Sequence, residues 1–391
     1  MAQDAFISHS AKDKPTAEIG PAAPQVSGPR SQGNVKKHGG RRKWILATLG
    51  AVAVVLTLLG LYFGWEPAGV RWVDRTKIGV TNDWLISVFA AGDGKRLWAV
   101  GSDMWFSGAE KGSVLESDDG GKTWRTTRSD SKPALSSICG TSDGKRLLAA
   151  GSAGAILESE DLGATWTVRT APTTADLYSI FCAGDGKHLW AVGGQGYDPT
   201  GDKDVGAIVE SVDGGASWTA RSSSAPGILR SIFGTSDGRR LWAVGEVGTM
   251  LESDDGGATW VVRRSGASDD LLESIFGTSD GMHLWAVEKH GKILESADGG
   301  ATWTERDTPA DDPSDYGCLY SGFASRDGKR VWLLGDGPAG QHILESDDGG
   351  VTWTWRYAQY MEVDSMAGTG DGKHLWAVGQ GGTILESDAG W

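Results

Sequence analysis

The sequence predicts an all-β fold, a seven-bladed β-propeller of four-stranded blades, preceded by one transmembrane helix. Three observations lead to this prediction. A turn of the form Ser-x-Asp-x-Gly-x-Thr-Trp, with Ser replacing Thr once, occurs six times and begins again at Ser387. Successive copies start 41 to 52 residues apart, a spacing typical of propeller blades of about 40 to 45 residues. A run of 22 residues without a charge precedes the first copy.

The repeat that contains Ser253 shows the four expected strands most clearly. Apolar runs at 229–234 and 240–245 flank Asp237-Gly238, and Asp-Gly between two such runs favours a hairpin. The third strand is expected before Ser253 and the fourth at 259–263. The same Asp-Gly pair occurs once in every repeat, so the chain is expected to form seven blades.

The residues of the repeated turn are interpreted as structural. Ser and Asp side chains accept hydrogen bonds inside tight turns, Gly adopts a backbone conformation that other residues resist, and Trp buries a large ring. The six complete copies contribute these Ser, Asp and Trp residues: Ser117, Asp119, Trp124, Ser159, Asp161, Trp166, Ser211, Asp213, Trp218, Ser253, Asp255, Trp260, Ser296, Asp298, Trp303, Ser346, Asp348 and Trp353.

The two chain ends are predicted to close the ring together. The last repeat supplies three strands and stops at Trp391, before a fourth. Near the start of the domain, Trp72 and Arg75 match the Trp-x-x-Arg pattern of the fourth strand in other repeats. An N-terminal strand is therefore expected to complete the seventh blade, which leaves no open sheet edge in the ring.

These repeats resemble the Asp-box (BNR) β-propellers, and the run LWAVG…ILES.DGG.TW is most similar to photosystem II assembly and stability factor-like proteins. The resemblance covers about residues 69–391. In the photosynthetic members it implies a scaffold that binds an assembly intermediate of a membrane protein. Sialidases and xyloglucanases also carry Asp-boxes, so the motif does not decide function. The Arg-Ile-Pro signature of the sialidases is absent from the chain.

Residues 44–65 are predicted to form an uncleaved transmembrane anchor. The segment has aromatic residues at both ends and would span about 33 Å as a helix. Lys and Arg residues precede it, so the positive-inside rule places residues 1–43 in the cytoplasm and the propeller, residues 66–391, outside it. The expected location is the cell membrane, with the propeller in the periplasm if the cell is Gram-negative.

Charge separates the tail from the propeller. Residues 1–43 carry a net charge of +5 and residues 66–391 a net charge of -19. An acidic domain repels phosphate backbones, so nucleic acid is not expected as a partner. The cysteines, Cys139, Cys182 and Cys318, are odd in number and occupy unmatched repeat positions, so thiols without a disulfide framework are expected.

Residues 4–14 resemble the opening of a TIR domain, which commonly reads D-x-F-I-S-[YH]-S-x-x-D. The match ends before a linker rich in Pro, Gly and Ser that begins near Pro21. Either residues 4–19 are the remnant of a TIR signalling domain or the match arises by chance. In both cases a lone strand cannot bury its apolar face, so residues 1–43 are predicted to be disordered and without NADase activity.

Partner binding is predicted on the side of the ring opposite the Asp-Gly turns, where the longer loops fall. Loops on a rigid scaffold commonly carry binding residues, and these loops place aromatic groups among carboxylates, which suits a protein partner or a basic peptide. The alternative is that they are solvated insertions. The candidate residues are Trp105, Phe106, Tyr197, Asp198, Asp311, Asp312 and Tyr316.

The sequence therefore favours a non-catalytic binding protein, which could be a scaffold, an assembly factor or a sensor ectodomain for an envelope or membrane protein. It contains no phosphate loop, nucleophile elbow or metal-ligand spacing, so no cofactor, metal or catalytic residue is predicted. Two alternatives remain: a propeller that binds or cleaves glycosides, and the remnant of a receptor that joined a TIR domain, an anchor and a propeller.

Overall fold

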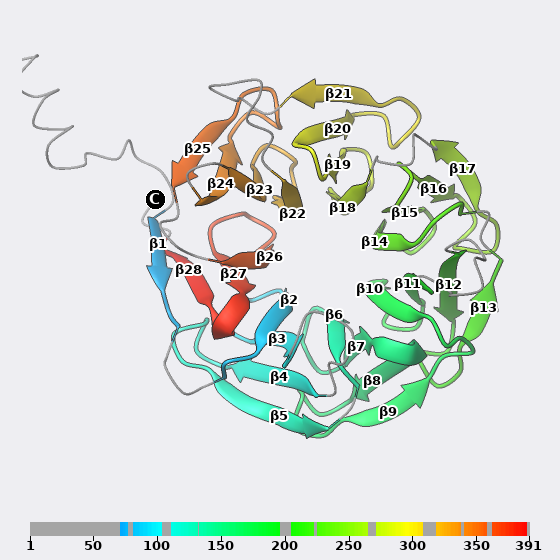
Figure 1. The fold of residues 1–391 in the computed structure, drawn as a ribbon, viewed down its shortest axis with the longest axis vertical. Coiled ribbons are helices and arrows are strands. Elements are labelled where there is room, and N and C mark those ends of the chain that lie inside the picture. The colour runs from blue at the N-terminus through cyan, green and yellow to red at the C-terminus, as the bar shows by residue number, and fades with distance from the viewer. Residues whose placement is uncertain are drawn as a thin grey trace, which may run out of the picture. The chain divides into compact units, whose positions relative to one another are not determined.

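A computed structural model of the protein describes residues 71–76, 81–103, 111–131, 133–195, 205–222, 225–264, 271–307, 318–337, 340–357 and 362–388. Within these ranges the strands form seven four-stranded antiparallel sheets arranged in a ring (Figure 1). The structure thus confirms the predicted seven-bladed β-propeller. The predicted tail 1–43 and anchor 44–65 lie outside the described residues. Among the residues that are described, no helix is long and apolar enough to cross a membrane.

The blades are numbered 1 to 7 in chain order. Their strands are β2 (Trp84–Ala90), β3 (Leu97–Ser102), β4 (Gly112–Ser117) and β5 (Arg125–Ser131); β6 (Leu135–Gly140), β7 (Leu147–Gly151), β8 (Ala155–Ser159) and β9 (Thr167–Thr170); β10 (Asp176–Cys182), β11 (Leu189–Gln195), β12 (Val205–Ser211) and β13 (Thr219–Arg221); β14 (Leu229–Gly234), β15 (Leu241–Gly245), β16 (Met250–Ser253) and β17 (Val261–Arg264); β18 (Leu272–Gly277), β19 (Leu284–Glu288), β20 (Lys292–Ser296) and β21 (Thr304–Asp307); β22 (Leu319–Ala324), β23 (Val331–Gly337), β24 (Gly340–Ser346) and β25 (Thr354–Tyr357); and, in blade 7, β26 (Val363–Gly368), β27 (Leu375–Gly379), β28 (Ile384–Asp388) and β1 (Arg71–Asp74).

The second strand of each blade is buried on both faces, apart from Gln195 and Asp336 near the ends of β11 and β23. In blade 4, for example, every residue of β15 is buried. A sheet packed between two neighbours has two apolar faces, so the strand reads as a continuous apolar run instead of an alternating one. The first strand of each blade lies nearest the centre of the ring and the fourth lies at its rim (Figure 1).

At five of the seven joints a tryptophan of the second strand contacts the glycine turn of the next blade, whereas blade 2 has Leu148 at this position. Trp190 donates a hydrogen bond to the carbonyl of Gly256, in the repeated turn of blade 4 (3.2 Å). The neighbouring Gly257 has a φ of 88°, and a Cβ added to it would lie 2.4 Å from Trp190 Nε1. The turn therefore needs glycine both for its backbone conformation and to admit the indole ring. Trp376 of blade 7 makes the equivalent bond to Gly120 of blade 1, at 3.0 Å.

Serines of the first strands also connect neighbouring blades. The backbone N–H groups of Ile138, Ile180, Ile232 and Ile275 donate, each at 3.2 Å, to the hydroxyl oxygens of Ser87, Ser137, Ser179 and Ser231. Each donor lies on the inner edge of a sheet, where no further strand can pair with it. These serines therefore satisfy part of the edge that faces the centre of the ring.

The ring closes as the sequence predicts. β1 pairs with β28 in antiparallel register, with Trp72 opposite Ser387. Arg75 Nε donates to Glu386 Oε2 at 2.7 Å, and Trp72 packs against the core between blades 6 and 7. One blade is thus built from both ends of the described chain.

The expectation that no cysteine forms a disulfide is wrong. Cys139 of β6 and Cys182 of β10 are joined in a disulfide between blades 2 and 3, whereas Cys318 is a free thiol. The two cysteines do occupy different repeat positions, since Cys139 lies opposite Leu148 and Cys182 lies opposite Leu189. Side chains one position apart in the repeat nevertheless meet across the joint between blades, and a comparison of equivalent positions does not reveal that contact.

A chain that begins at residue 77 lacks β1 and should be less stable than one that begins at residue 71. Loss of the Trp72 side chain from the core and of four ladder residues should lower the free energy of unfolding by roughly 3 kcal/mol or more. Urea denaturation of the two chains measures the difference. Equal midpoints would show that blade 7 is stable with three strands.

Candidate binding face

The carboxylates of the repeated turns accept hydrogen bonds from residues of their own turns. In blade 4, Ser253 Oγ donates to Asp255 Oδ1 at 2.8 Å, and Gly257 N donates to Ser253 Oγ at 2.9 Å. The backbone N–H and the hydroxyl of Thr259 donate to the two oxygens of Asp255 at 2.9 and 2.6 Å. The hydrogen bonds from Thr259 and Ser253 lower the pKa of Asp255 to about 2. These groups hold the turn, and little of their bonding capacity is left for a ligand.

Ion pairs in the third strands are equally structural. Glu252, which is 3% exposed, accepts from Arg263 Nε at 2.5 Å and from Arg240 Nη2 at 2.7 Å. Glu158 has the same arrangement, with Arg169 and Arg146 as its partners. A buried carboxylate needs such partners, because an unpaired one would lose its hydration without compensation.

The two ends of the ring differ in what they expose. We call the end that carries the Asp-Gly turns the turn face and the opposite end, where the first strand of each blade begins, the loop face. All seven binding residues predicted from the sequence, Trp105, Phe106, Tyr197, Asp198, Asp311, Asp312 and Tyr316, lie outside the described residues. Other residues of the loop face are described, and they form the candidate site.

Every blade has a β-bulge near the loop-face end of its first strand. In blade 4, Leu229 lies opposite Gly245 and Ser231 lies opposite Val244, so Arg230 is the extra residue. A bulge re-aims the side chain of its extra residue and often marks a functional position. The extra residues of the seven blades are Ile86, Ser136, Tyr178, Arg230, Glu273, Tyr320 and Asp364.

The bulged position varies between blades, whereas its neighbours do not. The residue before it is Leu in six blades and Val in the seventh, and the residue after it is always Ser. All seven bulged side chains are partly exposed. The fold therefore fixes the flanking positions and leaves one half-buried side chain per blade free to vary around the centre of the loop face.

Charged and aromatic groups meet on blades 3 to 5. The guanidinium of Arg230 lies 4.9 Å from the ring centre of Tyr178, and its Nη2 donates to Glu246 Oε1 at 2.6 Å. Burial raises the pKa of Glu273, against the opposing effect of the positive charges of Arg230 and Lys289. This part of the face presents a Tyr ring beside a nearly balanced set of charges.

The opposite part of the face is acidic. Asp364 of blade 7 accepts a hydrogen bond from Trp84 Nε1 of blade 1, across the joint that closes the ring. Burial, and to a smaller extent the nearby charges of Asp336 and Glu362, raise the pKa of Asp364 to about 6, although the bond from Trp84 opposes this shift. Burial also raises the pKa of Asp336.

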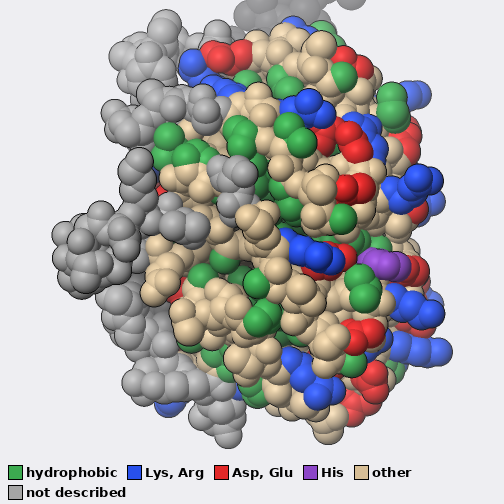
Figure 2. Space-filling model, turned by 90° about the vertical axis from the view of Figure 1, so that its right-hand side faces the viewer, with side chains coloured by type: hydrophobic (Ala, Val, Ile, Leu, Met, Phe, Trp, Pro, Cys, Tyr) green, Lys and Arg blue, Asp and Glu red, His purple; other side chains and the backbone are tan. Residues whose placement is uncertain are grey.

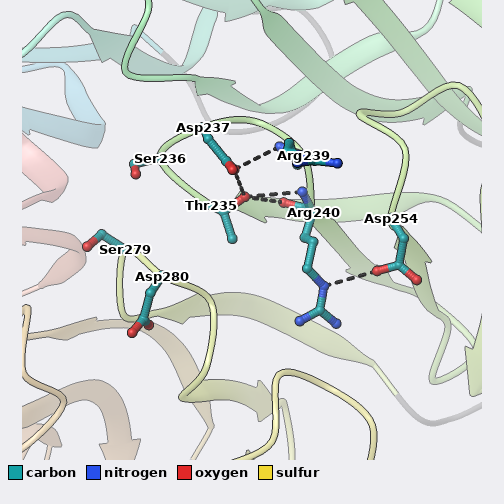
Figure 3. A pocket seen from close by; sticks show the side chains of 8 residues that line it. All are labelled: Thr235, Ser236, Asp237, Arg239, Arg240, Asp254, Ser279 and Asp280. Carbon is teal, nitrogen blue, oxygen red and sulfur yellow. Dashed lines mark hydrogen bonds and ion pairs between the residues drawn. The ribbon is translucent and has the colours of Figure 1, made fainter.

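The turn face has a polar hollow of about 560 Å³ between blades 4 and 5. Arg240 and Asp254, both of blade 4, line it and are joined by an ion pair, and Arg239 and Ser279 point away from the Arg240 guanidinium (Figure 3). Arg240 is already bound to Asp254, Glu252 and the carbonyl of Gly299. The hollow is therefore a gap between two turns. The guanidinium of Arg240, which lines it, already has protein partners.

Charges of both signs are interspersed over the side of the ring shown in Figure 2, and they gather toward its right-hand edge. That surface has no extended patch of a single sign. Within the described ranges there is also no group of three His, Cys, Asp or Glu side chains placed to hold a metal ion.

Comparison with known proteins identifies the fold. No family model and no curated protein matches the chain. Among solved structures, one described as "YCF48 bound to D1 peptide" is 21% identical, covers 82% of this chain and 96% of its own, and has a TM-score of 0.60. YCF48 from Cyanidioschyzon merolae is 18% identical over 81% of this chain and 98% of its own, with a TM-score of 0.59.

The chain is thus similar to propellers of the YCF48 type, and at this identity the likeness shows the fold alone. The Asp-box and TIR resemblances stay predictions, because no family model matches and residues 4–19 lie outside the described residues. The bulged residues were missed at the level of sequence. The sequence feature that could have revealed them is the pattern Leu-x-Ser, Val-x-Ser in the last repeat, whose middle residue differs in most repeats.

Replacing Asp364 with Asn should stabilise the protein at pH 8 and have little effect at pH 4. The carboxyl loses its proton near its ordinary pKa of 3.8 in the unfolded chain but only near 6 in the folded one. The folded state therefore binds the proton more tightly, and wild-type stability falls as the pH rises from about 4 through 6. The expected gain at pH 8 is roughly 3 kcal/mol, measured by urea denaturation at both pH values.

Asp364→Asn keeps an oxygen that can accept from Trp84, which separates the effect of charge from loss of this bond. Glu305→Gln, at an exposed carboxylate paired with Lys292 in blade 5, serves as the control and should show no such pH dependence. A gain of the same size at pH 4 and pH 8 would contradict the raised pKa.

Proposed function

We propose that this protein is a non-catalytic, membrane-anchored propeller outside the cytoplasm, whose loop face binds a segment of another membrane or envelope protein. The observation that carries the proposal is the set of seven bulged residues. A scaffold with near-constant flanking positions and one variable, half-exposed side chain per blade has the form of a recognition surface on a rigid frame.

The chemistry of the loop face suits a polypeptide. Tyr178 and Tyr320 offer rings that can pack against apolar side chains, and Tyr also donates and accepts hydrogen bonds. The acidic part around Asp336 and Asp364 favours a basic residue in the bound segment. One similar propeller is described as bound to a D1 peptide, which supports a peptide as the class of ligand for this chain.

Two observations support the location. The 22-residue apolar segment follows a basic stretch, which favours a cytoplasmic N-terminus and a propeller on the other side of the membrane. The disulfide between Cys139 and Cys182 is the kind of bond that persists in oxidising compartments outside the cytoplasm. The two arguments are independent, because one rests on residues before the propeller and the other on residues within it.

A photo-crosslinking residue in place of Tyr320 should yield a discrete protein adduct in native membranes. Tyr320 is a bulged residue of the loop face. The matched control carries the probe at Lys187, an exposed residue of a turn-face hairpin, and should give no adduct. Mass spectrometry of the adduct identifies the partner.

Adducts from both positions, or from neither, would contradict recognition by the loop face. If neither position gives an adduct, binding of oligosaccharides to the purified chain tests the glycoside-binding alternative. Hydrolysis of a sialoside or a β-glucan by the purified chain would replace the binding proposal with an enzymatic one.

Membrane topology can be tested separately with added protease. In spheroplasts, proteinase K should degrade an epitope placed after residue 391 and leave an epitope placed before residue 1 intact. Detergent should expose both epitopes to the protease. Protection of the C-terminal epitope in intact spheroplasts would place the propeller in the cytoplasm and refute the extracytoplasmic part of the proposal.

A further inference from the structure

The joint between blades 2 and 3 differs from its neighbours at the centre of the ring. At five of the other six joints a phenylalanine ring of one blade lies against a glycine in the first strand of the next, close enough that an added Cβ would come within 3.2 Å of it. These pairs are Phe89 and Gly140, Phe181 and Gly234, Phe233 and Gly277, Phe276 and Gly322, and Phe323 and Gly368.

The disulfide occupies the place of one such pair. Cys139 stands opposite Leu148 in its hairpin, as Phe181 stands opposite Trp190 in the next blade. Cys182 stands opposite Leu189, as Gly234 stands opposite Leu241. The phenylalanine position of blade 2 and the glycine position of blade 3 are therefore both cysteine, and a covalent bond replaces the contact between ring and glycine.

No β-ladder crosses this joint, because the two blades are separate sheets in the described structure. The contact between β6 and β10 consists of side-chain packing, the hydrogen bond from Ile180 N to Ser137 Oγ (3.2 Å) and the disulfide. A thiol is much smaller than a benzyl side chain, so two reduced cysteines would fill this space less well than Phe and Gly.

The joint that closes the ring, between blades 7 and 1, also lacks the phenylalanine. Ala367 stands opposite Trp376 at this position, and Ala90 stands opposite Leu97 at the position of the partner glycine. Blades 1 and 2 are thus bounded on one side by a joint between two alanines and on the other by the disulfide.

We propose that the Cys139–Cys182 bond is a redox-controlled joint, and that its reduction by a dithiol loosens blades 1 and 2 from the remaining five. This role is additional to partner binding and does not depend on it. The reductant thiolate attacks Sγ of Cys182, which is partly exposed, and Cys139 leaves as a thiolate and takes up a proton. The second thiol of the reductant then resolves the mixed disulfide and releases Cys182 as a thiol. Two electrons and two protons pass to the protein, and the dithiol becomes a disulfide.

The test compares the full-length chain in detergent before and after treatment with dithiothreitol. All variants carry Cys318→Ser, which removes the third thiol and prevents exchange. The melting temperature should fall by about 5 °C or more on reduction. Backbone hydrogen exchange should rise in β2, β6 and β10 and stay unchanged in β18 and β22.

The matched control is the double substitution Cys139→Phe and Cys182→Gly, which restores the pair found at the other joints. Its melting temperature should be close to that of the oxidised chain and should not respond to dithiothreitol. An equal response of control and parent to the reagent would overturn the proposal. If the control does not fold, the parent alone decides: an unchanged melting temperature and exchange pattern on reduction, or two free thiols before reduction, would refute the redox joint.

Discussion

The contact on which most joints of the ring depend is that between a second-strand tryptophan and the glycine turn of the next blade, which is described at five joints and replaced by Leu148 in blade 2. Blades share no backbone ladder, and single backbone hydrogen bonds, such as that from Gly184 N to the carbonyl of Ser236 (2.8 Å), join only their turns. Packing between the sheets themselves therefore falls to side chains. The indole of Trp190 fits beneath the turn of blade 4 only because Gly257 has no side chain. The hydrogen bonds of Ser253, Asp255 and Thr259 hold that turn in the required shape. The motif that is most visible in the sequence thus serves packing between blades, and its carboxylates accept hydrogen bonds from within their own turns.

The positions that this framework does not constrain are those best suited to recognition. The bulged residues are flanked by a buried apolar residue and by a serine that in several blades bonds the next blade, so these flanking contacts do not depend on the identity of the bulged side chain. A bulged residue can also destabilise the fold. The partial burial of Asp364 near other carboxylates disfavours its charged form at neutral pH. A group that weakens the fold under these conditions is retained more readily if it contributes to binding, which is why the acidic part of the loop face belongs to the candidate site.

The sequence predicts the fold well because the pattern of strands and turns recurs in all seven blades. The Asp-Gly hairpins, the apolar second strands and the match of Trp72 to the fourth strands determine blade number, strand order and closure. The disulfide could not be predicted in this way, because the contact joins Cys139 to a different repeat position in the next blade. The bulged residues were also missed, since a bulge depends on register between two strands and leaves only a weak pattern. The loop residues predicted as a binding site are aromatic or acidic, and they lie outside the described residues.

The use of β1 as the last strand of blade 7 restricts how the chain can be processed. Trp72 is separated by six residues from Trp65, the end of the apolar segment. A leader peptidase that removed this segment would have to cut before Arg71, since a cut even a few residues later would take a strand from the sheet along with the leader. For the same reason, an affinity tag or a fusion partner can replace residues 1–70 without removing a described strand, whereas a domain boundary drawn at the first complete repeat would yield a propeller with an open seam.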